Sequence, residues 1–352
     1  MKKHSIKVFS ISTVLLSICI MLFSTCKKEE VKTSVFNPQE GQTNWVKYAY
    51  QDITEVSEPD MFYVNIKDIE FLTEDIGYMV GGNQYHEISP KMFVTLDGGL
   101  TWTRNSQVHS CGSGSEFNSL ILGQNSSAFV SATCMGLRYV SSSDGLNWTQ
   151  TGFDQFSNDI PSADFKLNDT ILFLSSIRSI NGGSSWEQLP YPVNTTDYYF
   201  SSPQYGVCVT SSGQIYVSTD LGNSWQIVYD NPAKEFNTVT MTSSNVIIAA
   251  GNCIVSGDGV NWIQVSSKKN VFDVAFLNDQ IGFAAICDRE SSSGEILKTS
   301  DGGQTWSSNY HSAFMGFLKL NILNEWNVFA VGFQSNYKVG KCFFVKTTTL
   351  GE

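Results

Sequence analysis

The chain has 352 residues with a formal net charge of −11, and 41% of its residues are hydrophobic, 13% aromatic and only 16% charged. That length can form one large all-β domain or two ordinary domains, and the composition is typical of a soluble, folded protein and excludes a disordered one. The acidic balance argues against nucleic acid and anionic lipid surfaces as partners, because neither attracts a negatively charged protein.

The first 25 residues are predicted to be a secretory signal, since the basic stretch MKKHSIK precedes the apolar run VFSISTVLLSICIMLF. The following STC, which ends at Cys26, resembles a lipoprotein processing site, although Phe23 stands where Leu is usual. This resemblance implies lipidation of Cys26, a flexible tether over residues 26–42, and attachment to the membrane by the lipid anchor only. We therefore expect an outer-membrane lipoprotein of a bacterial cell envelope, periplasmic or surface-exposed. A plain secretory signal with an incidental cysteine is the alternative.

A short motif recurs six times after the tether, as in TLDGGLTW (Thr95–Trp102) and TSDGGQTW (Thr299–Trp306). Successive motif tryptophans are 37 to 46 residues apart, which is the length of one four-stranded antiparallel unit in a radial array. The acidic or amide position and the tryptophan of each copy are Asp97 and Trp102, Asp144 and Trp148, Asn181 and Trp186, Asp220 and Trp225, Asp258 and Trp262, and Asp301 and Trp306.

A second signature precedes several of these motifs: DIEFLTEDIGY, DYYFSSPQYGV and DVAFLNDQIGF align without gaps. Each predicts a strand, a polar turn and a second strand, while a third strand enters the motif and a fourth begins at its tryptophan. Residues 43–352 are therefore predicted to form an all-β, seven-bladed β-propeller of four-stranded antiparallel blades. The last blade would begin near Asn309, and the N-terminal strand around Trp45 would complete it, closing the ring and removing exposed sheet edges. Six or eight blades are the alternatives.

The motif pattern resembles the Asp-box, or bacterial neuraminidase repeat. The fuller unit, with its GY or GF strand followed by T-x-DGG-x-TW, resembles the photosystem II stability and assembly factor-like propellers. The resemblance covers essentially everything after residue 43. It implies a β-propeller with Asp-box turns, and it implies chaperoning or docking of the subunits of membrane complexes.

The motif itself is expected to be structural. Its Asp accepts N–H groups of the following turn, its glycines allow positive φ, and its tryptophan buries a large apolar surface. Asn181 fits this interpretation, because an amide cannot act as a general base.

Binding residues are therefore expected at the opposite end of the blades, where the loops between second and third strands lie. Those loops are long in blades 1, 6 and 7, which are neighbours in a closed ring, and they would form one raised lip. None of the histidines there has ligand spacing, so neither a metal nor a cofactor is expected. The candidate lip residues are Tyr85, His86, Glu87, His109, Asp288, Arg289, Glu290, Tyr310, His311, Tyr337 and Lys338.

The cysteines beyond Cys26 show no CxxC spacing, which argues against zinc and thioredoxin-like chemistry. Cys111–Cys134 is the one disulfide that the sequence suggests, and the others lie in apolar runs typical of buried thiols.

These features favour a monomeric, non-enzymatic envelope scaffold that binds a protein partner and has no catalytic residues. A glycan-binding module that uses the lip tyrosines for a surface glycan is one alternative. A sialidase-like glycoside hydrolase is another, but the chain after residue 25 has only four arginines and lacks an arginine motif before the first box.

Overall fold

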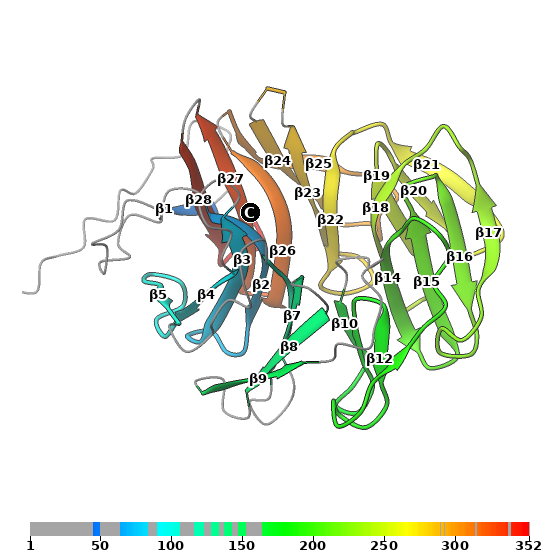
Figure 1. Ribbon diagram of the computed structural model, residues 1–352. Coiled ribbons are helices and arrows are strands. Elements are labelled where there is room, and N and C mark those ends of the chain that lie inside the picture. Colours follow the sequence, from blue (N-terminus) through cyan, green and yellow to red (C-terminus); the bar gives the residue numbers. More distant parts are fainter. Residues whose placement is uncertain are drawn as a thin grey trace, which may run out of the picture. The chain divides into compact units, whose positions relative to one another are not determined.

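The computed structural model describes residues 45–49, 64–83, 90–105, 116–122, 128–133, 137–142, 147–152, 164–288, 290–291, 293–313, 315–336 and 339–351. Within these ranges the chain forms 28 β-strands, arranged as seven four-stranded antiparallel sheets (Figure 1). No helix in the described ranges is long and apolar enough to cross a membrane.

The sheets are numbered here as blades 1 to 7, and the first three are built from consecutive strands with several short members. Blade 1 comprises β2 (Val64–Phe71), β3 (Gly77–Asn83), β4 (Pro90–Thr95) and β5 (Thr103–Arg104). Blade 2 comprises β6 (Glu116–Leu122), β7 (Ala128–Thr133), β8 (Leu137–Ser142) and β9 (Trp148–Gly152). Blade 3 comprises β10 (Asp164–Lys166), β11 (Leu172–Leu174), β12 (Ile177–Ser179) and β13 (Glu187–Gln188).

Blades 4 to 6 follow the same order with longer outer strands. Blade 4 comprises β14 (Thr195–Ser202), β15 (Tyr205–Thr210), β16 (Gln214–Ser218) and β17 (Gln226–Asp230). Blade 5 comprises β18 (Phe236–Met241), β19 (Ile247–Gly251), β20 (Ile254–Gly257) and β21 (Trp262–Ser266). Blade 6 comprises β22 (Val271–Phe276), β23 (Gly282–Asp288), β24 (Ser293–Thr299) and β25 (Ser307–Ser312).

The seventh sheet joins the two ends of the described chain. Its strands are β26 (Gly316–Asn324), β27 (Asn327–Asn336), β28 (Val339–Thr347) and β1 (Trp45–Ala49). β1 pairs antiparallel with β28, so that Trp45 lies opposite Thr347. The edge that β28 would otherwise expose is thereby covered by a strand from the start of the chain.

The blades are held together by apolar packing between neighbours. The first strand of each blade contacts the first strand of the next, and β26 contacts β2, so the series closes on itself. The buried hydrophobic side chains fall into clusters that each join two successive blades, such as Phe317 of blade 7 with Phe283 of blade 6. The fold is therefore a β-propeller in which every blade buries its faces against two others.

The blades differ from one another in construction and in strand length. Six of the described sheets are built from consecutive strands, whereas the remaining sheet is a composite of both chain ends. The blades are also unequal, because β13 has only two residues while β17 has five and β25 has six. The Asp-box turn is likewise not uniform among the blades, as its hydrogen bonds show below.

The GY and GF signature has a steric origin. A phenylalanine near the end of the first strand folds over a glycine near the start of the second, as Phe200 does over Gly206. A Cβ at Gly206 would lie only 2.2 Å from the Phe200 ring, and one at Gly282 only 2.8 Å from Phe276. Glycine is required there because the aromatic ring occupies the space of a side chain.

Candidate functional site

The structure describes only part of the predicted lip. Asp288, Glu290, Tyr310 and His311 are described, and the side chains of Glu290 and His311 are exposed. The carboxylate of Asp288 accepts the N–H of Glu290 at 3.0 Å and the hydroxyl of Ser291 at 2.6 Å, so it caps the turn after β23. The lip residues that lie outside the described residues are Tyr85, His86, Glu87, His109, Arg289, Tyr337 and Lys338.

The prediction that Tyr310 is a lip residue is wrong. Tyr310 is only 6% exposed and packs against Trp45, with ring centroids 6.1 Å apart, and edge-on against Phe317 at 5.7 Å. The reason is that β25 continues to Ser312, and successive side chains of a strand point to opposite faces. His311 therefore points outward while Tyr310 enters the core.

No metal site or disulfide is present in the described part of the chain. It contains no group of three or more His, Cys, Asp and Glu side chains placed to hold an ion. Cys208, Cys253 and Cys287 are buried, as predicted, and form no disulfide. Cys111 and Cys134 lie outside the described residues, so the disulfide between them stays a prediction.

The residues of the recurring motif, which resembles the Asp-box and is called the box below, hold turns between the third and fourth strands. In the sixth box the Asp301 carboxylate accepts the N–H of Thr305 at 2.9 Å and its hydroxyl at 2.6 Å. It also accepts the Thr299 hydroxyl at 2.8 Å, and Thr299 in turn accepts the N–H of Gly303 at 2.9 Å. Partial burial raises the pKa of Asp301, but these hydrogen bonds lower it overall, so the carboxylate stays ionised. The same contacts surround Asp97 and Asp220.

Three boxes depart from this arrangement. Asn181 keeps the acceptor role of Asp, and its Nδ2 donates to the Ser185 hydroxyl at 2.8 Å, which reverses the usual direction. Asp258, in a shortened box, accepts the N–H of Asn261 at 2.6 Å, so only a tight turn remains. In the last blade Thr349 replaces the Asp, and the Thr347 hydroxyl still accepts the N–H of Gly351 at 3.1 Å. Asp144 lies outside the described residues.

The box tryptophans are packing wedges. Trp306 meets Phe276 edge-on at 6.0 Å, and Trp148 meets Tyr78 of the preceding blade at 6.0 Å. The Trp306 indole N–H donates to Gly303 O at 3.1 Å, and the Trp186 indole does the same to Gly183. These boxes therefore contribute packing and turn geometry, with their carboxylates already occupied.

A second set of carboxylates joins the first strands of neighbouring blades. Asp68 follows a bulge in β2, and its two oxygens accept the N–H of Ile69 and the N–H of Leu120 in blade 2, both at 2.8 Å. Asp197 bridges blade 4 to Val239 of blade 5, and Asp273 bridges blade 6 to Leu320 of blade 7. Each of these carboxylates is thus a link between blades, satisfying donors that the bulge and the blade junction would leave unpaired.

One cation balances this inner set. Burial alone would lower the pKa of Lys319 in β26, but Asp273, Asp68, Asp164 and Asp197 raise it well above its usual range. Burial raises the pKa of Asp68 and of Asp197 to about 6, and the charge of Lys319 opposes this rise. Asp164 differs from the linking carboxylates, because its buried Oδ2 has no hydrogen-bond partner. The charge of Lys319 therefore acts on carboxyl groups that come from four blades.

A groove of about 510 Å³ lies on blade 4, bordered by the connection from blade 3. The connection that borders it runs from the end of the two-residue β13 to β14. The lining comes from that connection, from β16 with the turn before it, and from the end of the fourth box: Pro190, Tyr191, Pro192, Val193, Asn194, Ser212, Gln214, Tyr216, Asn223, Ser224 and Trp225.

Aromatic rings and amides dominate the groove, and no charged side chain lines it. Tyr191 stacks on Tyr198, with ring centroids 5.0 Å apart and 16° between the planes, and lies 5.5 Å from the Trp225 ring. Unlike Trp186 and Trp306, Trp225 has a buried indole N–H with no hydrogen-bond partner. The groove therefore contains a buried donor beside an aromatic surface.

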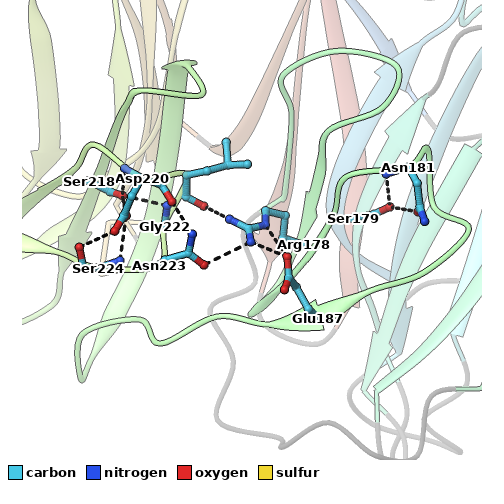
Figure 2. Close-up of polar contacts among 10 residues, drawn as sticks. Arg178, Ser179, Asn181, Glu187, Ser218, Asp220, Gly222, Asn223 and Ser224 are labelled. Atoms are coloured by element: carbon cyan, nitrogen blue, oxygen red, sulfur yellow. Dashed lines mark hydrogen bonds and ion pairs between the residues drawn. The ribbon is translucent and has the colours of Figure 1, made fainter.

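Arg178 of β12 contacts the loop of the fourth box (Figure 2), which supplies Asn223 and Ser224 to the groove lining. Its guanidinium donates to Leu221 O at 2.5 Å and to Asn223 Oδ1 at 3.2 Å, in the loop of the fourth box. It also forms an ion pair with Glu187, donating from Nε at 3.0 Å. Leu221 has a φ of 62°, the left-handed region that glycine occupies in other boxes, and the bond to its carbonyl helps to hold this turn.

Comparison with known proteins gives the fold. No family model matches the chain, and no curated protein matches it. A structure of YCF48 bound to a D1 peptide aligns with a TM-score of 0.66 and 18% identity, covering 90% of this chain and 99% of that one. YCF48 from Cyanidioschyzon merolae aligns at 0.61 and 15%, covering 86% and 98%. A GH74 enzyme of Niastella koreensis aligns at 0.55 and 12%, covering 80% of this chain but 58% of the enzyme. At these identities the likeness shows the β-propeller fold alone.

Sequence reasoning missed both the inner carboxylates and the groove. Asp68, Asp197 and Asp273 are the first letters of the three aligned units, but the alignment was interpreted only as a strand signature. The proline pair in LPYPV, which precedes β14, was a signal for an unusual connection between blades. No sequence pattern indicated that Trp225 would lack the hydrogen bond that Trp186 and Trp306 make.

Proposed function

We propose that this protein is a non-enzymatic scaffold of the bacterial cell envelope, anchored through a lipid on Cys26, that binds a protein partner. The main support for the proposal is that the described carboxylates of the boxes and of the inner strands already accept hydrogen bonds from the protein itself. Asp301, Asp68 and Asp273 each use both oxygens to accept hydrogen bonds within turns or between blades. A general acid or a nucleophile needs a carboxyl group aimed at substrate, whereas these carboxylates are engaged in holding turns and blade junctions.

The likeness to a peptide-bound propeller supports the same proposal. The structure of YCF48 bound to a D1 peptide is matched over 99% of its length. The proposal gives this chain the same general task, protein recognition, and assigns it to the lip formed by the loops of blades 6, 7 and 1. Glu290 and His311 are exposed at that end of blade 6.

The experiment is affinity enrichment from native membranes with the full-length lipoprotein as bait. A lip variant carrying Tyr85→Ala, Arg289→Ala and Tyr337→Ala is compared with the wild type, and a box-side variant, Val260→Ser, is the matched control because Val260 is exposed at the opposite end of its blade. We expect a defined set of proteins to be retained by the wild type and the control and depleted about tenfold or more in the lip variant. Retention of every partner by the lip variant would show that the lip is not the binding surface.

The GH74 likeness makes glycoside hydrolysis the second outcome to test. The purified protein is incubated with β-glucans and sialosides, and the reducing sugar and sialic acid released are measured. The proposal predicts no release above buffer. Release that disappears in a Glu87→Gln, Asp288→Asn, Glu290→Gln variant would replace the scaffold function by an enzymatic one.

A further inference from the structure

We propose that the groove on blade 4 binds a proline-rich segment of a protein partner in the extended polyproline II conformation. This inference rests on the proposed function, because it assumes that the ligand is a protein. It adds a second recognition surface, separate from the lip, and names the chemistry of the segment that fits it.

The hydrogen-bonding groups of the groove call for a ligand with acceptors. The Trp225 indole is a donor only, it is buried, and it has no partner in the structure. The neighbouring Asn223 and Tyr216 side chains already donate, to Asp220 O at 2.6 Å and to Gln214 Oε1 at 3.1 Å. Polyproline II chains have carbonyl groups without internal hydrogen bonds, and proline adds no N–H that would need an acceptor.

The apolar surface of the groove suits proline rings. The rings of Tyr191 and Trp225 lie 5.5 Å apart and border the same space as Pro190 and Pro192. Val193 is 82% exposed at its rim. Aromatic-lined grooves recognise proline-rich segments because the pyrrolidine rings pack on the aromatic faces, and the chain is already extended before it binds.

The absence of charge in the lining narrows the class of ligand. The nearest guanidinium, that of Arg178, is only 5% exposed and is committed to Glu187, Leu221 and Asn223. It is therefore unavailable to a phosphate or a carboxylate. A neutral proline-rich segment leaves no charge unpaired in the groove, whereas an acidic or basic motif would be desolvated without a partner.

The test is a titration of the full-length protein with a fluorescent, neutral twelve-residue peptide made of three Pro-Leu-Pro-Pro units. A peptide with alanine at every proline is the ligand control. We expect saturable binding of the first peptide only. Trp225→Phe, which keeps a ring but removes the N–H, should weaken binding about tenfold, and Tyr191→Ala should abolish detectable binding.

Trp262→Phe is the matched protein control, because Trp262 also has an unpaired indole N–H in a box but does not line the groove. Its affinity should equal that of the wild type, and circular dichroism shows whether each variant is folded. The inference is overturned if the proline peptide does not saturate, if Trp225→Phe binds as well as the wild type, or if a neutral oligosaccharide competes for the groove. The two tests can fail separately. If a membrane partner depends on the lip but the peptide does not bind, only this inference is refuted and the proposed function stands.

Discussion

Replacing Lys319 by methionine is expected to lower the free energy of unfolding by about 3–5 kcal/mol at pH 8, because it removes the cation from a set of half-buried and buried carboxyl groups. Asp68, Asp164, Asp197 and Asp273 all act on this ammonium group, and they come from four different blades. The loss should appear as a lower urea midpoint. Lys269→Met, at an exposed position, is the control and should change little.

The same variant should recover stability at acid pH. Burial raises the pKa of Asp68 and of Asp197 to about 6, and that of Glu70 to about 8. A carboxyl group whose folded pKa lies above its unfolded value binds more protons in the folded state, so it lowers stability as pH rises from about 4 toward 8. Without Lys319 these pKa values rise further, and the deficit of the variant should shrink between pH 8 and pH 5. Asp164→Asn added to Lys319→Met should restore part of the stability at pH 8. Equal stability of wild type and variant at both pH values would contradict this explanation of the inner carboxylates.

Trp45→Ala is expected to lower the free energy of unfolding by about 3–5 kcal/mol, as the truncation of a buried aromatic side chain does. Trp45 is 5% exposed, meets Phe283 edge-on at 6.1 Å, and donates its indole N–H to Asn309 Oδ1 at 2.6 Å. These contacts hold β1, which pairs with β28, against blade 6, so their loss should also free the N-terminal strand. Thermal denaturation measures the stability, and protease sensitivity near residue 45 measures the release of β1.

Trp326→Ala is the control for this experiment, because Trp326 is 60% exposed in the turn between β26 and β27. Its melting temperature should stay close to that of the wild type. If Trp45→Ala is no less stable than Trp326→Ala, the N-terminal strand does not lock the last sheet.

The Asp-box positions were predictable from sequence because their chemistry is local. Thr299, Asp301 and Thr305 contact one another within one turn, so the spacing of the letters carries the geometry. The role of Trp45 was also foreseen, since the last box ends at Gly351 before any tryptophan and an early tryptophan was available. In both cases comparison among the copies of the motif indicates the role of a residue or shows which residue one copy lacks.

The inner carboxylates and the groove could not be predicted in the same way. The Asp68 carboxylate accepts the N–H of Leu120, which is 52 residues away in the sequence. Only the three-dimensional packing of two blades brings these residues together. The groove is lined by three segments, residues 190–194, 212–216 and 223–225, which only tertiary packing brings together. Tyr310 was misassigned because the length of β25, which decides whether it faces the core, is likewise a tertiary property.

The central claim is that a protein partner docks at the end of the blades opposite the Asp-boxes. Blade 6 offers a matched pair of exposed positions at its two ends. Glu290 lies in the turn between β23 and β24, next to the paired residues Asp288 and Ser293. Gln304 lies in the box at the opposite end, beyond the paired residues Gly282 and Thr299. A photo-crosslinking residue is placed at one position or the other in the full-length protein, and the adducts are identified by mass spectrometry. A protein adduct is expected from position 290 and none from position 304. Adducts from position 304 alone, or the same adducts from both positions, would contradict it.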